Sequence, residues 1–396
     1  MMAVTAPTYA PSAAPPAPAG QRVRVLIADD SAVVRGLVAR WVAEAGHEVV
    51  ATASNGRIAL EAMSRHEPDV ILLDIDMPEM DGTQALPLLL AKSPGVQVIM
   101  MSTLTTRNAD ISLRCLALGA VDYIPKPESN RGVTTSDAFR IDLIERVRVF
   151  GAARARKRGP SSAPGAGYAA SAVPGTQSPS PVSALRPTSP LVLRPKSRTG
   201  VPPRVLLIGA STGGPRAVGE VLEKIGAPTL RQFPVLIVQH MPPVFTAVFA
   251  EHLGARTGLP AAEGKADERL QPGRIYVAPG GRHMGLAGQR QDVTIRLHDG
   301  PVVNFCRPAV DVLFQDAAAI FGPATLSVVL TGMGSDGTGG ARALTEAGGA
   351  VLAQDEATST VWGMPGSIAK AGLAQAILPL AEIGPALRNL LTGQGA

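Results

Sequence analysis

A serine in a glycine-rich turn is the residue of this 396-residue chain best suited to nucleophilic chemistry. Ser211 lies in the segment Gly-Ala-Ser-Thr-Gly-Gly at residues 209–214, directly after the apolar run 205–208. A strand that feeds such a turn and opens a helix lifts a hydroxyl to the edge of a sheet, where helix-start amides can receive developing negative charge. The same pattern fits a phosphate-binding loop, so a partner base is needed to decide between the two.

A histidine and a carboxylate occupy equivalent positions further along the chain. His240 follows the apolar run 235–238, and Asp336 lies in the loop after the run 326–330. The carboxyl ends of parallel strands converge on one crevice in an open sheet. We therefore expect Ser211, His240 and Asp336 to share a site.

These three residue types suit acyl transfer. Ser211 would be the nucleophile, His240 the general base that takes its proton, and Asp336 the carboxylate that orients the imidazole. The chain order Ser, His, Asp differs from the Ser, Asp, His order of α/β-hydrolases, so that fold is not indicated. Two simpler interpretations stay open: a loop histidine at His240, and a helix N-cap at Asp336 before Gly337.

A second cluster of polar residues lies in the N-terminal third of the chain. The apolar run 23–28 ends in Asp29 and Asp30, and the run 70–73 ends in Asp74. Three carboxylates at neighbouring strand ends make a hard-oxygen pocket suited to Mg²⁺.

A hydroxyl and an ammonium follow two further apolar runs. Ser102 comes after residues 98–101, and Lys126 after residues 121–124. With these residues the segment 22–150 resembles a response-regulator receiver domain. The resemblance implies that Asp74 accepts a phosphoryl group from a CheA-type histidine kinase. It also implies Mg²⁺ ligation by Asp29, Asp30, Asp74 and the Asp76 carbonyl, and phosphate sensing by Ser102 and Lys126 with Tyr123 as the aromatic that changes packing.

The segment 203–393 resembles the catalytic domain of CheB-type chemotaxis proteins, the protein-glutamate methylesterase/glutaminase family. The matching motifs are spread over almost the whole segment: Gly209–Gly214, Gln239–Pro242, Tyr276–Gly280, His283-Met284, Arg307–Phe314, Thr331–Gly337 and Gly363–Pro365. The family's triad falls on the three residues already selected, with Thr212 and the Met333 backbone amide as candidate oxyanion and orientation groups by the same resemblance. His283, the competing histidine, is expected to have a structural or cleft-lining role.

The resemblance implies a phosphorylation-regulated hydrolase for chemotactic adaptation. It would remove methyl groups from methylglutamates of chemoreceptors, release methanol, and deamidate specific glutamines. Mg²⁺ would serve phosphorylation, and the esterase reaction would need no cofactor. We further expect the unphosphorylated receiver to occlude the Ser211 cleft and phosphoryl-Asp74 to weaken that contact.

Two proline-rich segments separate the chain into a tail, two domains and a linker between them. Proline is enriched in a tail, 1–21, and in a linker, 151–202, which together hold 14 of the 35 prolines. Both are expected to be disordered, because neither has the apolar periodicity of a packed element. No apolar run approaches the roughly 20 residues of a membrane span, and the tail lacks a signal peptide's apolar core. A cytoplasmic protein without membrane insertion is expected. Cys115 and Cys306 suit a reducing compartment and are interpreted as ordinary small hydrophobes.

The net charge of +5 and the basic run 154–158 raise the alternative of a non-catalytic or DNA-binding response regulator. A DNA-binding output module would be small and would need a recognition helix, whereas roughly 190 residues of alternating strand and helix follow the linker. We therefore expect no nucleic-acid partner.

The alternation predicts an α/β protein with two doubly wound parallel sheets, a flavodoxin-like receiver and a Rossmann-like methylesterase domain. In the second domain the residues 293–297 alternate in polarity, which indicates an antiparallel excursion. A final helix is expected over 383–391. The predicted strands are 23–28, 48–53, 69–73, 96–101 and 121–124 in the first sheet and 204–208, 235–239, 274–278, 326–331 and 350–353 in the second.

Overall fold

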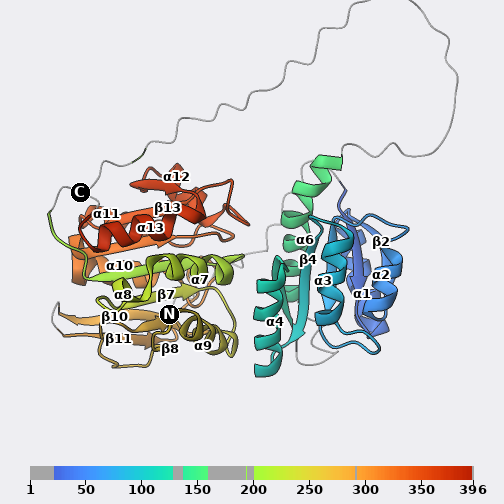
Figure 1. Ribbon diagram of the computed structural model, residues 1–396, viewed down its shortest axis with the longest axis horizontal. Coiled ribbons are helices and arrows are strands. Elements are labelled where there is room, and N and C mark those ends of the chain that lie inside the picture. The colour runs from blue at the N-terminus through green and yellow to red at the C-terminus, as the bar shows by residue number, and fades with distance from the viewer. Residues whose placement is uncertain (1–21, 128–136, 159–192, 194–199, 290–291, 395–396) are drawn as a thin grey trace, which may run out of the picture.

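A computed structural model describes residues 22–127, 137–158, 193, 200–289 and 292–394. Two sheets covered by helices lie side by side (Figure 1). The expected tail, 1–21, lies outside the described residues, and so does most of the expected linker, 151–202. Within the described ranges, no helix has the length and apolar character needed to cross a membrane.

The N-terminal sheet has five parallel strands in the order β2-β1-β3-β4-β5, which confirms the predicted doubly wound topology. Every residue of its central strand β3 is buried, as expected for a strand covered by helices on both faces. The last helix, α6, runs past the expected domain end at residue 150. The elements are β1 (Arg24–Ala28), α1 (Ala32–Glu44), β2 (Glu48–Ala53), α2 (Gly56–Ala62), β3 (Val70–Asp74), α3 (Gly82–Lys92), β4 (Gln97–Thr103), α4 (Thr106–Leu118), β5 (Asp122–Lys126) and α6 (Asp137–Arg158).

The C-terminal sheet has seven parallel strands in the order β14-β13-β12-β6-β7-β9-β8. The strands are β6 (Val205–Ala210), β7 (Val235–Gln239), β8 (Ala261–Glu263), β9 (Ile275–Val277), β12 (Thr325–Val329), β13 (Ala350–Gln354) and β14 (Ala376–Leu378). Strands β8 and β14, each of three residues at an edge of the sheet, were not predicted. The five predicted strands are confirmed.

The helices and one hairpin cover this second sheet. The predicted antiparallel excursion is confirmed as the hairpin of β10 (His283–Gln289) and β11 (Asp292–His298). The helical elements are α7 (Gly214–Ile225), α8 (Ala227–Leu230), α9 (Phe245–Thr257), α10 (Val310–Phe321), η1 (Gly322–Ala324), α11 (Thr338–Glu346), α12 (Met364–Lys370) and α13 (Leu380–Leu391).

Strand β6 occupies the point where the order of the second sheet reverses. The chain passes from β6 to β7 on one side and later returns to β12 on the other. Ligand crevices of open α/β sheets form at such a reversal, beyond the carboxyl ends of the strands. The loops after β6, β7 and β12 therefore meet at this edge.

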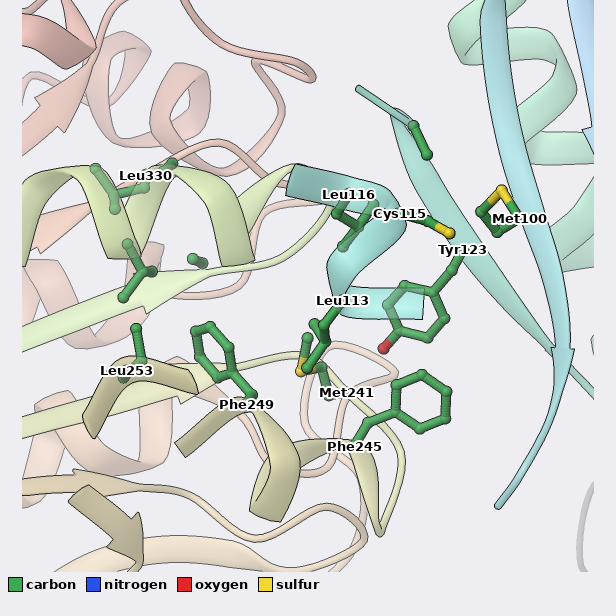
Figure 2. Close-up of a cluster of buried hydrophobic side chains, with 14 of the residues drawn as sticks. Met100, Leu113, Cys115, Leu116, Tyr123, Met241, Phe245, Phe249, Leu253 and Leu330 are labelled. Carbon is green, nitrogen blue, oxygen red and sulfur yellow. The ribbon is translucent and has the colours of Figure 1, made fainter. Parts of the chain in front are cut away.

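The two domains share an apolar contact. Helix α4 of the first packs against α9 and α7 of the second, and one continuous core cluster contains residues of both. Figure 2 shows Leu113 of α4 between Phe249 of α9 and Tyr123. Because these side chains are buried, separating the domains would expose apolar surface to water.

An aromatic stack and an ion pair flank this apolar contact. The Tyr123 and Phe245 rings lie nearly parallel, with centroids 4.5 Å apart and an interplanar angle of 4°. The His252 Nε2 atom lies 2.7 Å from Asp110 Oδ1, with both side chains about one-third exposed. An ion pair that is this exposed contributes little, so apolar burial and stacking dominate the contact.

Replacing Tyr123 with leucine should loosen the interdomain contact without emptying the position. The aromatic stack contributes about 0.5–1.5 kcal/mol beyond burial, so the opening equilibrium should rise about 2- to 10-fold. Hydrogen exchange of the α4 and α9 amides measures that opening. Asp110→Asn, which removes the partner of His252, is the comparison variant and should raise the exchange rates less. Equal exchange rates in wild type and Tyr123→Leu would show that the stack does not stabilise the interdomain contact.

Candidate active site

Ser211 lies in the turn between β6 and α7. Its amide donates to the Thr331 carbonyl at 3.1 Å, and its carbonyl accepts from Gly214 N at 2.7 Å. Gly213 has φ +76°, and a Cβ there would lie 2.3 Å from Thr360 Oγ1. Only glycine satisfies both conditions, so the turn that presents the Ser211 hydroxyl depends on this residue.

Asp336 is buried at the centre of a hydrogen-bond network. Its Oδ2 accepts from His240 Nε2 at 2.8 Å and from Val310 N at 2.6 Å, while its Oδ1 accepts from Asn304 Nδ2 at 3.0 Å and Asp311 N at 3.2 Å. Burial acts to raise the pKa of Asp336, but the hydrogen bonds led by His240 hold it below its usual value. The carboxylate is therefore ionised at neutral pH.

The network also decides the capping alternative for Asp336. Helix α11 has Gly337 as its N-cap and receives no side-chain capping bond. The Asp336 carboxylate instead accepts the first amides of a different helix, α10, where the helix dipole favours a negative charge. Asp336 thus joins His240 to the start of α10.

His240 is held with Nε2 on the Asp336 carboxylate and Nδ1 turned to the Cys306 thiol. Burial acts to lower its pKa, but hydrogen bonds to Asp336 and Cys306 raise the pKa of His240 to about 9. Among the described residues, the Ser211 hydroxyl makes no hydrogen bond to His240. The Nδ1 atom instead lies 3.5 Å from Cys306 Sγ. Catalytic hydrogen bonds are often absent before substrate binds, so this geometry leaves Nδ1 available to Ser211.

The interpretation of Cys306 as an ordinary small hydrophobe is wrong. Its thiol contacts the His240 imidazole and lines the same cavity as Ser211. No spacing in the sequence indicates this contact, because it depends on how the loop before α10 folds over β7. Cys115 is buried in the core of the first domain, as predicted, and both cysteines are free.

Two amide side chains and a glycine that the sequence did not single out hold the site together. Gln239 Nε2 donates to the carbonyl oxygens of Ser211 at 2.8 Å and His240 at 3.3 Å. Asn304 Nδ2 bridges Asp336 to Asp311. A Cβ on Gly332 would lie 2.8 Å from Ser211 Cβ, so glycine lets the loop after β12 pack against the serine.

The candidate oxyanion groups flank the serine. Thr212 is buried, and its carbonyl accepts from Thr331 Oγ1 at 2.9 Å. Met333 follows Gly332 in the loop that packs on Ser211. No hydrogen bond within the described part of the chain uses the Met333 amide, which leaves that donor available.

A cavity of about 280 Å³ lies over these residues and is lined by both domains. Ser211, His240 and Cys306 contribute from the second domain, and Asp122 and Arg146 from the first. Burial raises the pKa of Asp122, which the Arg146 guanidinium at 2.9 Å opposes. The first domain thus supplies two charged side chains, from β5 and α6, to the wall of the cavity that contains Ser211.

His283 is far less accessible than His240. It is fully buried, with Nε2 2.9 Å from the Pro301 carbonyl and Nδ1 accepting from Ala309 N at 3.2 Å. Both ring nitrogens are therefore used to hold the chain before α10. This arrangement favours the expected structural role.

The N-terminal acidic residues converge as predicted. Asp29, Asp30 and Asp74 place carboxylate oxygens within 4.8 Å of one another. Lys126 Nζ lies 2.7 Å from Asp74 and 3.2 Å from Asp29. Burial raises the pKa of Asp74 to about 7, although Lys126 acts to lower it. Three crowded carboxylates opposed by one ammonium form a donor set that fits Mg²⁺.

The remaining receiver residues lie beside this cluster. Ser102 is buried at the end of β4 and accepts from Ser112 Oγ at 3.0 Å. The Asp76 side chain accepts from Asn108 Nδ2 at 3.0 Å, so that carboxylate is turned to α4. Tyr123 is buried against the second domain rather than beside Asp74.

Family patterns match both halves of the chain. The family model of the response regulator receiver domain matches residues 25–136, and that of the CheB methylesterase matches residues 206–387. The second match occupies the region in which a DNA-binding output module would have to lie. A receiver joined to a methylesterase domain is thus the class of protein that fold and site define.

Full-length relatives show the same pairing of domains. A protein-glutamate methylesterase/protein-glutamine glutaminase of group 2 operon from Bradyrhizobium diazoefficiens is 50% identical, over 94% of each chain. A relative of the same description from Rhodopseudomonas palustris is 49% identical, covering 94% of this chain and 95% of its own. The crystal structure of the Thermotoga maritima CheB methylesterase catalytic domain is 39% identical, covers 48% of this chain and 100% of that one, and has a TM-score of 0.46. The chain belongs to the family of protein-glutamate methylesterases/protein-glutamine glutaminases.

The His240 imidazole should titrate near pH 9, well above the usual value of 6.5. A pKa raised by folding means that the His240–Asp336 pair contributes stability below about pH 6.5 that is lost as pH rises through about 9. Histidine ring resonances of labelled protein measure the midpoint. Asp336→Asn should lower it most and Cys306→Ala less, whereas a wild-type midpoint near 6.5 would contradict the hydrogen-bond assignment.

Proposed function

We propose that this enzyme hydrolyses the γ-methyl esters of methylglutamates on the cytoplasmic helices of chemoreceptors and deamidates specific glutamines there. The observation that carries the proposal is a serine in a strand-to-helix turn that opens on the same cavity as a hydrogen-bonded His240–Asp336 pair. Such a substrate also assigns the enzyme to the cytoplasm. Family membership supplies the substrate class, and the cavity geometry supports the chemistry.

In the proposed mechanism, Nδ1 of His240 takes the serine proton in the fraction of enzyme whose imidazole is neutral, and that fraction grows as pH rises toward about 9. Nε2 is committed to the Asp336 carboxylate, which stabilises the imidazolium once it forms. Ser211 Oγ attacks the γ-carbonyl carbon, and the methoxy C–O bond breaks as His240 returns the proton, so methanol leaves. Water then attacks the acyl-enzyme by the same proton path. With glutamine, ammonia leaves in place of methanol.

The developing oxyanion would be met by donors on both sides of Ser211. We assign this role to the Met333 amide and to Thr212, which flank the serine from the loop after β12 and from the turn itself. Preorganised donors of this kind contribute about 100-fold or more in rate. The hydrogen bonds from Gln239 to the Ser211 and His240 carbonyls fix the positions of the nucleophile and the base relative to each other.

The receiver would inhibit the enzyme by closing this cavity. A receptor helix with side chains is about 10–12 Å across, which is too wide for a cavity of about 280 Å³ that receiver residues wall on one side. Phosphorylation of Asp74 by a CheA-type histidine kinase, with Mg²⁺ held by Asp29, Asp30, Asp74 and the Asp76 carbonyl, would weaken the interdomain contact. Ser102 and Lys126 would sense the phosphoryl oxygens, and Tyr123 would pass the change to Phe245, on which it stacks.

Ser211→Ala and His240→Ala should each lower methanol release from methylated receptor membranes by at least about 1,000-fold, because a triad acts as a unit. Gas chromatography of released methanol measures the rate. Ser335→Ala, which removes an exposed hydroxyl next to Asp336, is the matched control and should stay close to wild type. Retention of wild-type activity by Ser211→Ala would exclude the serine mechanism.

Asp74→Asn should abolish stimulation by acetyl phosphate and Mg²⁺ while leaving the basal rate, because it removes the phosphoryl acceptor and not the esterase site. The ratio of methanol release with and without phosphodonor is the measurement. Asp69→Asn, a buried carboxylate at the other end of β3, is the control for loss of a buried charge in the same sheet. Undiminished stimulation of Asp74→Asn would place the phosphorylation site elsewhere.

A further inference from the structure

A thiol and an imidazole meet in the esterase cavity in a way that the proposed ester hydrolysis does not require. Cys306 Sγ lies 3.5 Å from Nδ1 of His240, and the structure places His240, Cys306 and Asp336 together as a group whose ligand atoms all lie within 4.8 Å. We propose that Cys306 and His240 form an inhibitory binding site for a soft divalent cation, of which Zn²⁺ is the best fit.

The spacing of the two ligand atoms fits one shared ion. Zn–N and Zn–S bonds of about 2.0–2.1 and 2.3 Å at a tetrahedral angle put nitrogen and sulfur about 3.5 Å apart. That is the separation of Nδ1 and Sγ in this structure. An ion can therefore lie between the two atoms with no change in their distance.

Asp336 does not bind the ion itself but hydrogen-bonds the histidine that does. Its hydrogen bond to Nε2 fixes the histidine tautomer that leaves Nδ1 as the donor atom. A metal-bound histidine generally gives its second ring N–H to a carboxylate in this manner, which raises its basicity. The same hydrogen bond that prepares His240 for Ser211 thus prepares it for a metal.

The loop that carries Cys306 is fixed before any ion arrives. Cys306 and Val303 exchange two backbone hydrogen bonds, at 2.8 and 3.1 Å. Between them Asn304 and Phe305 both have positive φ, at 51° and 64°. The Asn304 amide ties this loop to Asp336, so the thiol and the imidazole are held on one framework. A preformed pair of ligands lowers the ordering entropy that binding would cost.

Ligand chemistry separates this site from the acidic cluster of the receiver. Thiolate and imidazole select Zn²⁺ over Mg²⁺, whereas three carboxylates select Mg²⁺. Cys306 is partly exposed and lines the cavity, so an ion and its waters can reach it. Zn²⁺ binds a thiolate and a neutral imidazole, so the protons on Sγ and Nδ1 are released to solvent, and the ion occupies the Nδ1 lone pair that would accept the Ser211 proton. The enzyme is then inhibited at its base.

The test is a titration of the full-length enzyme with buffered Zn²⁺ in excess Mg²⁺, following methanol release with each variant normalised to its own zinc-free rate. Wild type should be inhibited at micromolar Zn²⁺, with or without acetyl phosphate, and recover with a zinc-selective chelator. Cys306→Ser should raise the inhibitory concentration at least about 10-fold. Cys115→Ser, which removes the other cysteine, should behave as wild type.

A second readout does not depend on ester hydrolysis, on which the proposal otherwise rests. Co²⁺ added to the full-length protein should give a thiolate-to-metal absorption band that Cys306→Ser lacks and Cys115→Ser retains. The band without activity would leave the metal site standing and overturn the esterase assignment. Equal zinc sensitivity of wild type and Cys306→Ser, or no band in wild type, would overturn the metal site.

Discussion

The active site of the second domain depends on the hydrogen bonds that the buried Asp336 carboxylate accepts. It is nearly inaccessible and accepts four hydrogen bonds, which connect His240, Asn304 and the first two amides of α10. An ionised carboxylate in such a place is tolerable only because every bond offsets part of its desolvation. The network therefore sets the tautomer of His240 and the start of α10 at the same time. Loss of any partner would disturb both.

The architecture of the sheet explains why this network lies beside Ser211. Strand β6 sits where the strand order reverses, so the turn after it is flanked by the loops that follow β7 and β12. Gly332 lets the loop after β12 pack against Ser211, and Gly213, in the serine's own turn, makes room for the side chains of Thr331 and Thr360. The receiver then covers the same edge through α4 and Tyr123, and a regulatory domain and an active site come to share one cavity.

The sequence predicted the parts of this arrangement that depend on local pattern. Apolar runs that end in polar residues predicted both parallel sheets and the convergence of His240 with Asp336, because parallel strands end at a common edge. Gln239 and Asn304 could not be predicted, since uncharged amides at loop positions carry no distinctive pattern. Cys306 was misinterpreted because its neighbour His240 lies 66 residues away and meets it only after the loop folds. The Tyr123–Phe245 stack depends on the relative placement of two domains, which no periodicity encodes.

The stack between Tyr123 and Phe245 has a thermodynamic consequence that runs in both directions. Phosphorylation of the receiver is proposed to weaken its contact with the catalytic domain. By linkage, any ligand that binds the catalytic domain only when that contact is broken must favour the phosphorylated receiver by the same factor. Under the proposed function, a receptor helix bound over Ser211 would compete with the receiver for that surface. Receptors would thus act as effectors as well as substrates, raising the population of the active state of the enzyme that demethylates them.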